Sequence, residues 1–330
     1  MKKRVASSLK NAIMPEHPVP DVLFLVFNRP SLTQTVFNAI KKSRPSRIFI
    51  AADGPRKNNE LDVILCKQVR DIVAKVDWEC EIKTLFREEN LGCRVAITSA
   101  IDWFFNHVDE GIILEDDCLP SDSFFSFCGL MLERYKHNDQ IMQINGSFHL
   151  HQFESFDESY YFSKLNGCWG WATWKRAWGM FDADMIGYEK SRDKGEVGKY
   201  YENRQISNWM ISYLEEANSP SCGIWSTQWA YSILKNNGLC INPTINMVNN
   251  IGFFDTPTSG VHESFSSYSD YMLEDFNHIK HPDKIQYNVS NDILEFKHII
   301  QLTDPRLINK GFINFSKRVL VKGLNLFREK

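Results

Sequence analysis

The stretch GIILEDDCLP, residues 111–120, joins a short apolar run directly to three consecutive acids. A run of this length is typical of a buried strand, so we predict a strand that ends at the acids. Three earlier apolar runs are each closed by polar or turn residues, at Val22–Phe27, Arg47–Ala52 and Glu81–Phe86. Helical spacing of apolar side chains separates them, for example over 60–75. This alternation predicts an α/β chain with a doubly wound, mostly parallel sheet.

Polar side chains follow the ends of these predicted strands. Arg29 follows the first, Asp53 the second, and Glu115, Asp116 and Asp117 the fourth. In doubly wound sheets ligands bind outside the carboxyl ends of the strands, so we expect these residues to share a site. Neighbouring acids repel one another, and a hard cation such as Mg²⁺ or Mn²⁺ would relieve that cost. Because Mg²⁺ takes few protein carboxylates, the triplet suits a metal that arrives with a nucleotide diphosphate. An acidic loop or helix cap is the alternative.

Composition and charge exclude several classes of protein. The 330 residues carry a net charge of −3, both ends are basic, and the body between them is therefore acidic. An acidic body argues against nucleic-acid binding, although the basic tail 310–330 could contact an anionic membrane surface. No apolar run approaches the roughly 20 residues that span a bilayer. Without a secretory leader or a Cys-x-x-Cys pair, we expect a cytoplasmic protein, either free or peripheral on the inner face of the membrane.

Several motifs together resemble one enzyme family. They are Phe27-Asn28-Arg29-Pro30, Ala52-Asp53-Gly54, Asn90-Leu91-Gly92 and Glu115-Asp116-Asp117. In this order they resemble the nucleotide-sugar glycosyltransferases of the GT-A fold, most of all a bacterial branch related to the animal N-acetylglucosaminyltransferase I family. The likeness covers about residues 20–265 and continues through Gly170-Trp171, Trp225 to Trp229, Pro243 and Asn250-Ile251-Gly252.

The resemblance implies a role for each strand-end residue. Asp117, the last acid, would bind Mn²⁺ or Mg²⁺ directly. Glu115 and Asp116 would contact the nucleotide or metal-bound water. Arg29 would meet the donor diphosphate, and Asp53 the uracil ring if the donor is a UDP-sugar.

Four further residues are weaker candidates. Arg94 could face a donor phosphate from a helix start, although a solvated arginine is the commoner outcome. The resemblance places His262 in a loop that closes over the donor phosphates, with an exposed histidine as the alternative. Trp169 and Trp171 could form an acceptor platform, because indoles stack on sugar faces; packing in the core is the alternative.

The catalytic base departs from the family pattern. The family has an aspartate directly after the residue matching Trp225, and this chain has Ser226 there. Serine cannot act as a general base at neutral pH without a partner. Another carboxylate could reach in, with Asp255, Asp182 and Asp184 as candidates. Alternatively, the alignment with the family is locally offset, or the enzyme is impaired or uses another stereochemistry.

The sequence therefore predicts a metal-dependent glycosyltransferase that moves a sugar from a nucleotide diphosphate sugar, with UDP-sugars favoured, to a hydroxyl of a glycan acceptor. Inversion follows from the resemblance, and a lipid-linked acceptor in surface polysaccharide biosynthesis is the natural expectation. The alternatives are a nucleotidyltransferase or sugar-nucleotide hydrolase on a similar fold, and an impaired donor-binding protein.

Four parts are expected along the chain. A basic N-terminal extension covers 1–19 and a nucleotide-sugar-binding half covers 20–139. An irregular, aromatic-rich acceptor half of the same domain covers 140–265, and its charged stretch 182–205 is expected to be an irregular surface excursion. A C-terminal helical segment with the basic amphipathic tail covers 266–330.

Overall fold

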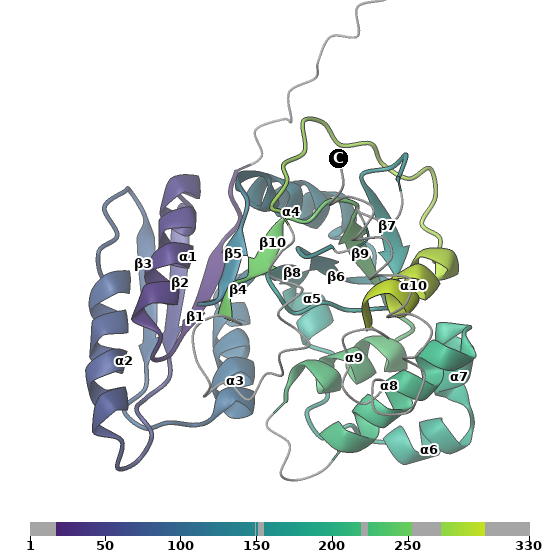
Figure 1. Ribbon diagram of the computed structural model, residues 1–330, viewed down its shortest axis with the longest axis horizontal. Coiled ribbons are helices and arrows are strands. Elements are labelled where there is room, and N and C mark those ends of the chain that lie inside the picture. The colour runs from purple at the N-terminus through teal and green to yellow at the C-terminus, as the bar shows by residue number, and fades with distance from the viewer. Residues whose placement is uncertain (1–17, 149, 151–154, 219–223, 253–271, 301–330) are drawn as a thin grey trace, which may run out of the picture.

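The computed structural model describes residues 18–148, 150, 155–218, 224–252 and 272–300. Its main sheet is formed by β1 (Val22–Val26), β2 (Arg47–Ala52), β3 (Glu81–Phe86), β4 (Glu110–Glu115), β6 (Ile141–Asn145), β7 (Tyr160–Ser163), β8 (Trp171–Trp174) and β9 (Leu239–Pro243). A smaller sheet pairs β5 (Cys118–Pro120) with β10 (Val248–Asn250). Figure 1 shows the main sheet running through the whole molecule.

The main sheet has eight strands in the order β3-β2-β1-β4-β8-β6-β9-β7. The first four are parallel, which confirms the predicted α/β architecture. β8 is antiparallel to both β4 and β6, so β6 and its parallel neighbour β9 point the same way as β4. The carboxyl ends of β1, β2, β4, β6 and β9 therefore share one edge of the sheet, and both halves of the chain contribute to it.

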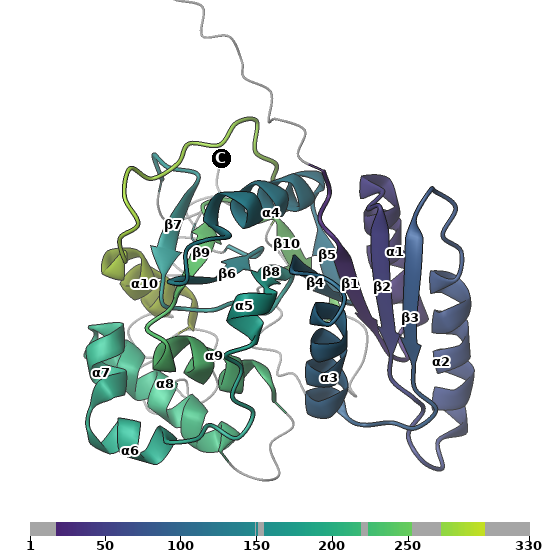
Figure 2. The same cartoon turned by 180° about the vertical axis from the view of Figure 1, so that it is seen from behind.

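Helices cover both faces of this sheet. One face packs against α1 (Pro30–Ser43), α2 (Glu60–Val73) and α4 (Asp122–Tyr135). The other packs against α3 (Cys93–Phe105), α5 (Lys175–Trp178) and α9 (Ser226–Lys235), and Figure 2 shows α3 and α5 near its centre. The remaining helical segments are α6 (Tyr188–Asp193), α7 (Glu196–Tyr201), α8 (Arg204–Ala217), α10 (Val289–Glu295) and a π-helical turn (Phe296–Ile300).

The core follows from the two-residue repeat of the strands. In β1, Phe24 faces α1, α2 and α4, whereas Leu23 and Leu25 face α3, α5 and α9. Both sides of this strand are buried because helices cover both faces of the sheet. A continuous apolar run, as the sequence has here, is the pattern that such a strand requires.

The structure corrects one expectation about helices. The charged stretch 182–205 is not an irregular excursion, because it contains α6 and α7. Each begins after a glycine with positive φ, Gly187 and Gly195, and buries Tyr188 and Val197 in a shared cluster. Six-residue helices are too short to show a clear period in the sequence.

Some expectations concern residues outside the described part of the chain. The tail 310–330, most of the extension 1–19, Asp255 and His262 belong to this group. Among the helices that the structure does describe, none is both long and apolar enough to cross a membrane.

Candidate functional site

The acidic triplet lies where β4 ends and the chain turns into β5. Glu115 is the last residue of β4, and Asp116 and Asp117 form the turn. A residue far away in the sequence holds this turn in place: the backbone N–H of Ile251 donates to the carbonyl of Asp117 at 2.8 Å. Asp116 is buried, whereas Glu115 and Asp117 are half-buried. The triplet thus forms a rigid, partly open acidic corner at the shared edge of the sheet.

Arg29 binds two of the three acids. It follows β1 and caps the start of α1, where Pro30 is the first helical residue. Its Nη1 donates to Asp117 Oδ2 at 2.9 Å, and its Nη2 forms an ion pair with Asp116. The guanidinium thus bridges two neighbouring carboxylates. In this structure the arginine expected to bind diphosphate therefore contacts the acids expected to bind metal.

Burial and repulsion dominate the electrostatics of the corner. Burial, followed by the charges of Asp117 and Asp116, raises the pKa of Glu115 well above its ordinary value. Burial also raises the pKa of Asp116, although Arg29 opposes this. Burial alone would lower the pKa of Arg29, but the two aspartates raise it above its ordinary value. The corner therefore holds more negative charge than Arg29 neutralises, and it would gain from a further cation.

The donor atoms fit a hard divalent cation that brings its own ligands. Asp116 Oδ2 is buried without a hydrogen-bond partner in the described part of the chain. Across the described residues, no group of three His, Cys, Asp or Glu side chains forms a complete metal cage. Mg²⁺ commonly uses one or two carboxylates and completes its shell with water and phosphate oxygens. Asp117 and Asp116 could supply those carboxylates, and the remaining ligands would have to come from substrate or solvent.

Gly252 packs directly against this ion pair. A Cβ at Gly252 would lie 2.6 Å from Asp117 Oδ2 and 3.1 Å from Arg29 Nη1. Its N–H donates to the Asn250 side chain at 2.9 Å, which fixes the chain as it leaves β10. Only a residue without a side chain leaves the present positions of Asp117 and Arg29 undisturbed.

Asp53 ties two loops together. Its carboxylate accepts hydrogen bonds from the backbone N–H groups of Gly54 at 3.0 Å and Leu91 at 3.1 Å, and from Asn90 Nδ2 at 2.9 Å. A Cβ at Gly54 would lie 2.4 Å from the backbone of Glu89, so the two loops touch. Asp53 thus holds the loop after β2 against the loop before α3, and a uracil ring would have to share an already occupied carboxylate.

Arg94 and the candidate base Asp182 both make hydrogen bonds with the segment before α6 or from within it. Arg94 Nη2 donates to the carbonyl of Ala183 at 2.6 Å. Asp182 accepts from Lys235 Nζ at 2.8 Å and from the N–H of Ile186 at 2.9 Å. Asp184 is exposed. In this structure Arg94 and Asp182 therefore fix the segment before α6.

Ser226 occupies the position at which the resembled family has its base. It begins α9, and its side chain hydrogen-bonds to Cys168. Burial and then the charge of Glu115 raise the pKa of Cys168 to about 12, with Asp117 adding to the effect. Ser226 and two acids of the triplet therefore both influence the thiol of Cys168.

The two candidate acceptor tryptophans differ in exposure. Trp171 is 1% exposed and stacks on Trp225 with ring centroids 5.8 Å apart, so it packs in the core. Its Nε1 is buried without a hydrogen-bond partner in the described chain. Trp169 is half-buried and packs beside Phe148. Of the two, only Trp169 has an accessible surface to offer to a sugar.

A buried polar row next to this site was missed in the sequence. Asn145, at the end of β6, donates through Nδ2 to Asn242 Oδ1 at 2.5 Å. Asn242 Nδ2 in turn lies 3.3 Å from the hydroxyl of Tyr161 and 3.5 Å from Glu295 Oε2. Burial, followed by the charge of Asp292, raises the pKa of Glu295 to about 8. Asn145, a polar residue inside an apolar strand, was the available signal.

Sequence comparisons do not assign a family. The sequence matches no protein-family model. It also matches no curated protein.

Similar solved structures include a mannosyltransferase from Pyrobaculum calidifontis in complex with GDP-mannose and Mn²⁺, at 9% identity and a TM-score of 0.36, covering 68% of this chain and 72% of that one. Mouse xyloside xylosyltransferase 1 has 9% identity and a TM-score of 0.30, covering 65% and 81%. The inositol-1-phosphate CTP transferase from T. maritima has 10% identity and a TM-score of 0.26, covering 50% and 75%. Each likeness is partial, and the function of this chain is inferred below from its own residues.

Proposed function

We propose that this protein is a metal-dependent glycosyltransferase that uses a nucleotide diphosphate sugar. The observation that carries the proposal is the corner formed by Asp116, Asp117 and Arg29 at the shared edge of the sheet. It combines a surplus of carboxylate charge with a guanidinium that can bind phosphate oxygens in a bidentate way. The GT-A resemblance of the same motifs supports the assignment to glycosyl transfer.

Each residue then has a defined task. Asp117, with Asp116 beside it, would hold Mn²⁺ or Mg²⁺, which when bound would neutralise the charge that develops on the leaving diphosphate. Arg29 would hold the diphosphate from the side of α1. Asp53 would set the wall that the nucleotide base meets, and a UDP-sugar is the favoured donor.

The acceptor would lie over the second half of the sheet edge. Half-buried Trp169 offers an apolar face, and the polar row at Asn145 and Asn242 offers hydrogen-bond partners for hydroxyl groups. A glycan acceptor that is lipid-linked, in surface polysaccharide assembly, is the substrate we favour. Ser226 gives this site no base of its own, and inversion is proposed on the family resemblance alone.

Ser226 also supports two other candidate functions. A nucleotidyltransferase or a sugar-nucleotide hydrolase would use the same acidic corner without an acceptor base, and an impaired donor-binding protein would need no base at all. These candidates differ in their products. A glycosyltransferase releases nucleoside diphosphate in proportion to acceptor, a nucleotidyltransferase releases pyrophosphate from a nucleoside triphosphate, and a binding protein releases neither.

Product analysis therefore tests the proposal. The purified full chain would be incubated with UDP- and GDP-sugars and Mn²⁺, with and without a mixture of glycan acceptors, and nucleoside diphosphate and free sugar would be measured. In a parallel incubation with nucleoside triphosphates, sugar 1-phosphates and Mn²⁺, pyrophosphate would be measured. We expect nucleoside diphosphate release that rises with acceptor and stops with a chelator. Pyrophosphate release, or binding without any turnover, would contradict the proposal.

A further inference from the structure

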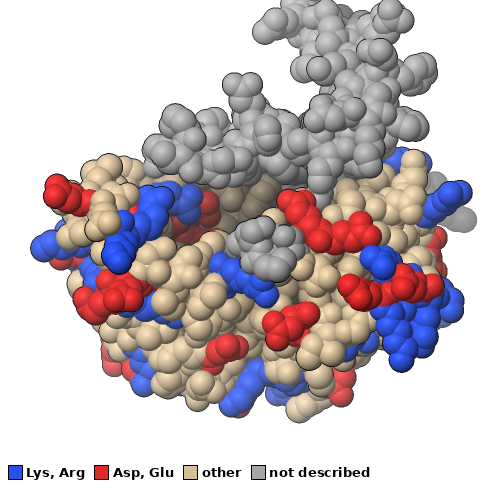
Figure 3. Space-filling view, turned by 90° about the horizontal axis from the view of Figure 1, so that it is seen from below, with Lys and Arg blue, Asp and Glu red and all other residues tan. Residues whose placement is uncertain are grey.

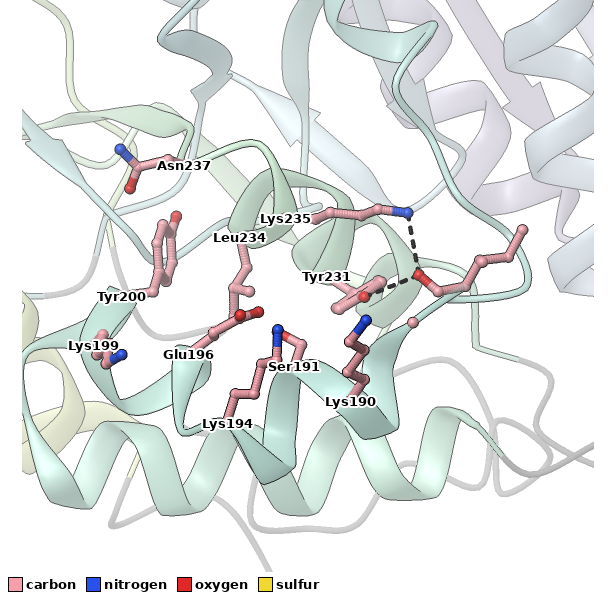
Figure 4. A pocket seen from close by; sticks show the side chains of 12 residues that line it. Lys190, Ser191, Lys194, Glu196, Lys199, Tyr200, Tyr231, Leu234, Lys235 and Asn237 are labelled. Carbon is pink, nitrogen blue, oxygen red and sulfur yellow. Dashed lines mark hydrogen bonds between the residues drawn. The ribbon is translucent and has the colours of Figure 1, made fainter.

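A second cavity, apart from the acidic corner, opens between α6, α7 and the end of α9 (Figure 4). Its volume is about 430 Å³. This lies within the usual range for small-molecule sites. The cavity is lined by Ile186, Gly187, Lys190, Ser191, Lys194, Glu196, Lys199, Tyr200, Tyr231, Leu234, Lys235 and Asn237.

Positive charge dominates this cavity. Figure 4 shows Lys190 and Lys194 extending from the α6 side toward α9, with Lys199 at one end. Lys235 is committed to Asp182, but no ion pair joins the other three lysines to a carboxylate within the described chain. Glu196 is the single acid in the lining. Figure 3 shows blue and red side chains intermixed on the face seen from below, so the excess of positive charge belongs to the lining of the cavity and not to the whole face. An anionic ligand would relieve the mutual repulsion of these lysines.

Part of the cavity wall is apolar, and hydrogen bonds fix its position. Tyr231 and Leu234 are buried, whereas Ile186 is 70% exposed at the rim. The carbonyl of Ile186 accepts from Tyr231 Oη at 3.2 Å and from Lys235 Nζ at 3.1 Å. Mixed walls of this kind, with apolar surface and a few convergent charges, suit a compact ligand that is both carbon-rich and anionic. A sugar that carries a carboxylate or phosphate has this chemistry.

The cavity is connected to the proposed transfer site by a single helix. α9 begins at Ser226, the position at which the resembled family has its base, and ends at Lys235, in the lining of the cavity. At 1.5 Å per residue, its ten residues span about 15 Å. The segment before α6 also joins the two places, since Arg94 holds Ala183 and Lys235 holds Asp182. A chain of a few sugars could therefore occupy both sites.

We propose that this lysine cavity binds an acidic sugar unit, bearing carboxylate or phosphate, of the acceptor glycan. This inference rests on the proposed glycosyltransferase function and identifies the acceptor as an anionic glycan. The reacting hydroxyl would lie near Ser226, and the acidic unit would lie further along the same chain. A concave cavity of this size favours a discrete sugar unit over the flat surface of a membrane.

The test is a binding measurement without donor or metal, so that its result is independent of catalysis. The full chain in chelator would be titrated with fluorescent oligosaccharides of equal length, one rich in uronic acid, one carrying phosphate groups and one neutral. The variant K190Q/K194Q/K199Q would be compared with K57Q/K75Q/K284Q, which removes the same charge from exposed lysines elsewhere. Circular dichroism would verify that both variants are folded.

We expect at least one acidic oligosaccharide to bind the wild type, the neutral one to bind at least ten-fold more weakly, and the cavity variant alone to lose at least ten-fold in affinity. Which acidic probe binds more tightly identifies carboxylate or phosphate as the ligand group. Equal losses in both variants would overturn the inference. The inference would also be overturned if the cavity variant, but not the control variant, lost binding to anionic vesicles while it still bound the acidic oligosaccharides.

Donor binding, measured separately with nucleotide sugars and Mn²⁺, distinguishes the two proposals. If donor binds but no acidic oligosaccharide does, the cavity assignment fails and the proposed function stands. If acidic oligosaccharides bind at the cavity but no donor binds, the proposed function fails, and with it the assignment of the ligand as an acceptor.

Discussion

Arg29 Nη1 lies 2.9 Å from Asp117 Oδ2, although 88 positions separate the two residues in the sequence. The contact exists because β1 and β4 are adjacent parallel strands whose carboxyl ends meet at one edge. It brings together the residue expected to bind diphosphate and the residue expected to bind metal. The diphosphate of the proposed donor and the metal ion would therefore both be bound within one ion-pair network.

Replacing Asp117 with Asn should remove the charge of the proposed metal ligand while keeping its shape. We expect nucleoside diphosphate release to fall by roughly 100-fold or more, because one electrostatic contact in a transition state has about this effect. Asp71→Asn, on the exposed side of α2, is the matched control and should leave the rate unchanged. Wild-type turnover in folded Asp117→Asn would refute the metal assignment.

Replacing Arg29 with Met should destabilise the folded protein. The buried carboxylate of Asp116 would lose its partner, and breaking a buried pair in this way costs about 3 kcal/mol. Denaturant unfolding would measure the loss. We expect added Mn²⁺ to recover part of it in the variant, more than it stabilises the wild type. The account of the corner would be wrong if the variant were as stable as the wild type.

Gly252→Ala should act on function more than on folding. The new Cβ would meet Asp117 Oδ2 at 2.6 Å and displace it. We expect weaker Mn²⁺-dependent donor binding, measured by calorimetry. Gly198→Ala is the matched control, because nothing lies within 4 Å of its Cβ and it sits inside α7. That change should be neutral or stabilise by up to about 1 kcal/mol. Equal donor affinity in both variants would contradict the role given to Gly252.

The carboxyl group of Asp292 should make stability depend on pH. Burial raises its pKa to about 7, although Ser163 Oγ and the N–H of Lys164 donate to it and Tyr287 is also a partner. The folded protein then binds a proton that the unfolded chain has released, so the stability that Asp292 contributes is greatest at acid pH and falls as pH rises from about 4 to about 7. Glu295, whose pKa is about 8, should extend the fall.

Asp292→Asn should flatten that slope by up to about 1.4 kcal/mol per pH unit. Urea unfolding at pH 5, 6, 7 and 8 would measure it, with exposed Asp283→Asn as the control. Parallel curves for wild type and Asp292→Asn would show that this carboxyl does not carry the effect.

The first half of the fold follows from the sequence because its strands are short, apolar and separated by well-patterned helices. Val22–Val26 and Arg47–Ala52 are buried almost throughout, and such runs leave few alternatives. Serine is a favoured N-cap residue, yet α1 begins before Ser31: Pro30 occupies its first helical position and Arg29 precedes it. At this helix start, the fixed φ of proline outweighs the preference for a serine N-cap.

The ends of the predicted strands indicated the candidate site residues, but not the partners that these residues contact. That Asp53 is occupied by Asn90 and Leu91, and that Arg29 contacts Asp117, depends on distances between distant loops. For Trp171 the sequence left an acceptor platform and packing in the core both open, and the structure buries it among other indoles. Such pairings need tertiary structure, because a sequence pattern reports only which face of its own element a residue occupies.

The most direct test of the donor site is a thermal-shift measurement on the full chain with UDP, GDP and their sugars, each with and without Mn²⁺. A ligand at one hundred times its Kd should stabilise by roughly 2.7 kcal/mol and raise Tm measurably. We predict that one nucleotide raises the Tm of the wild type only when Mn²⁺ is present, and that folded Asp117→Asn shows no such shift. Absence of a shift with every nucleotide at millimolar concentration and Mn²⁺ would contradict the proposed function.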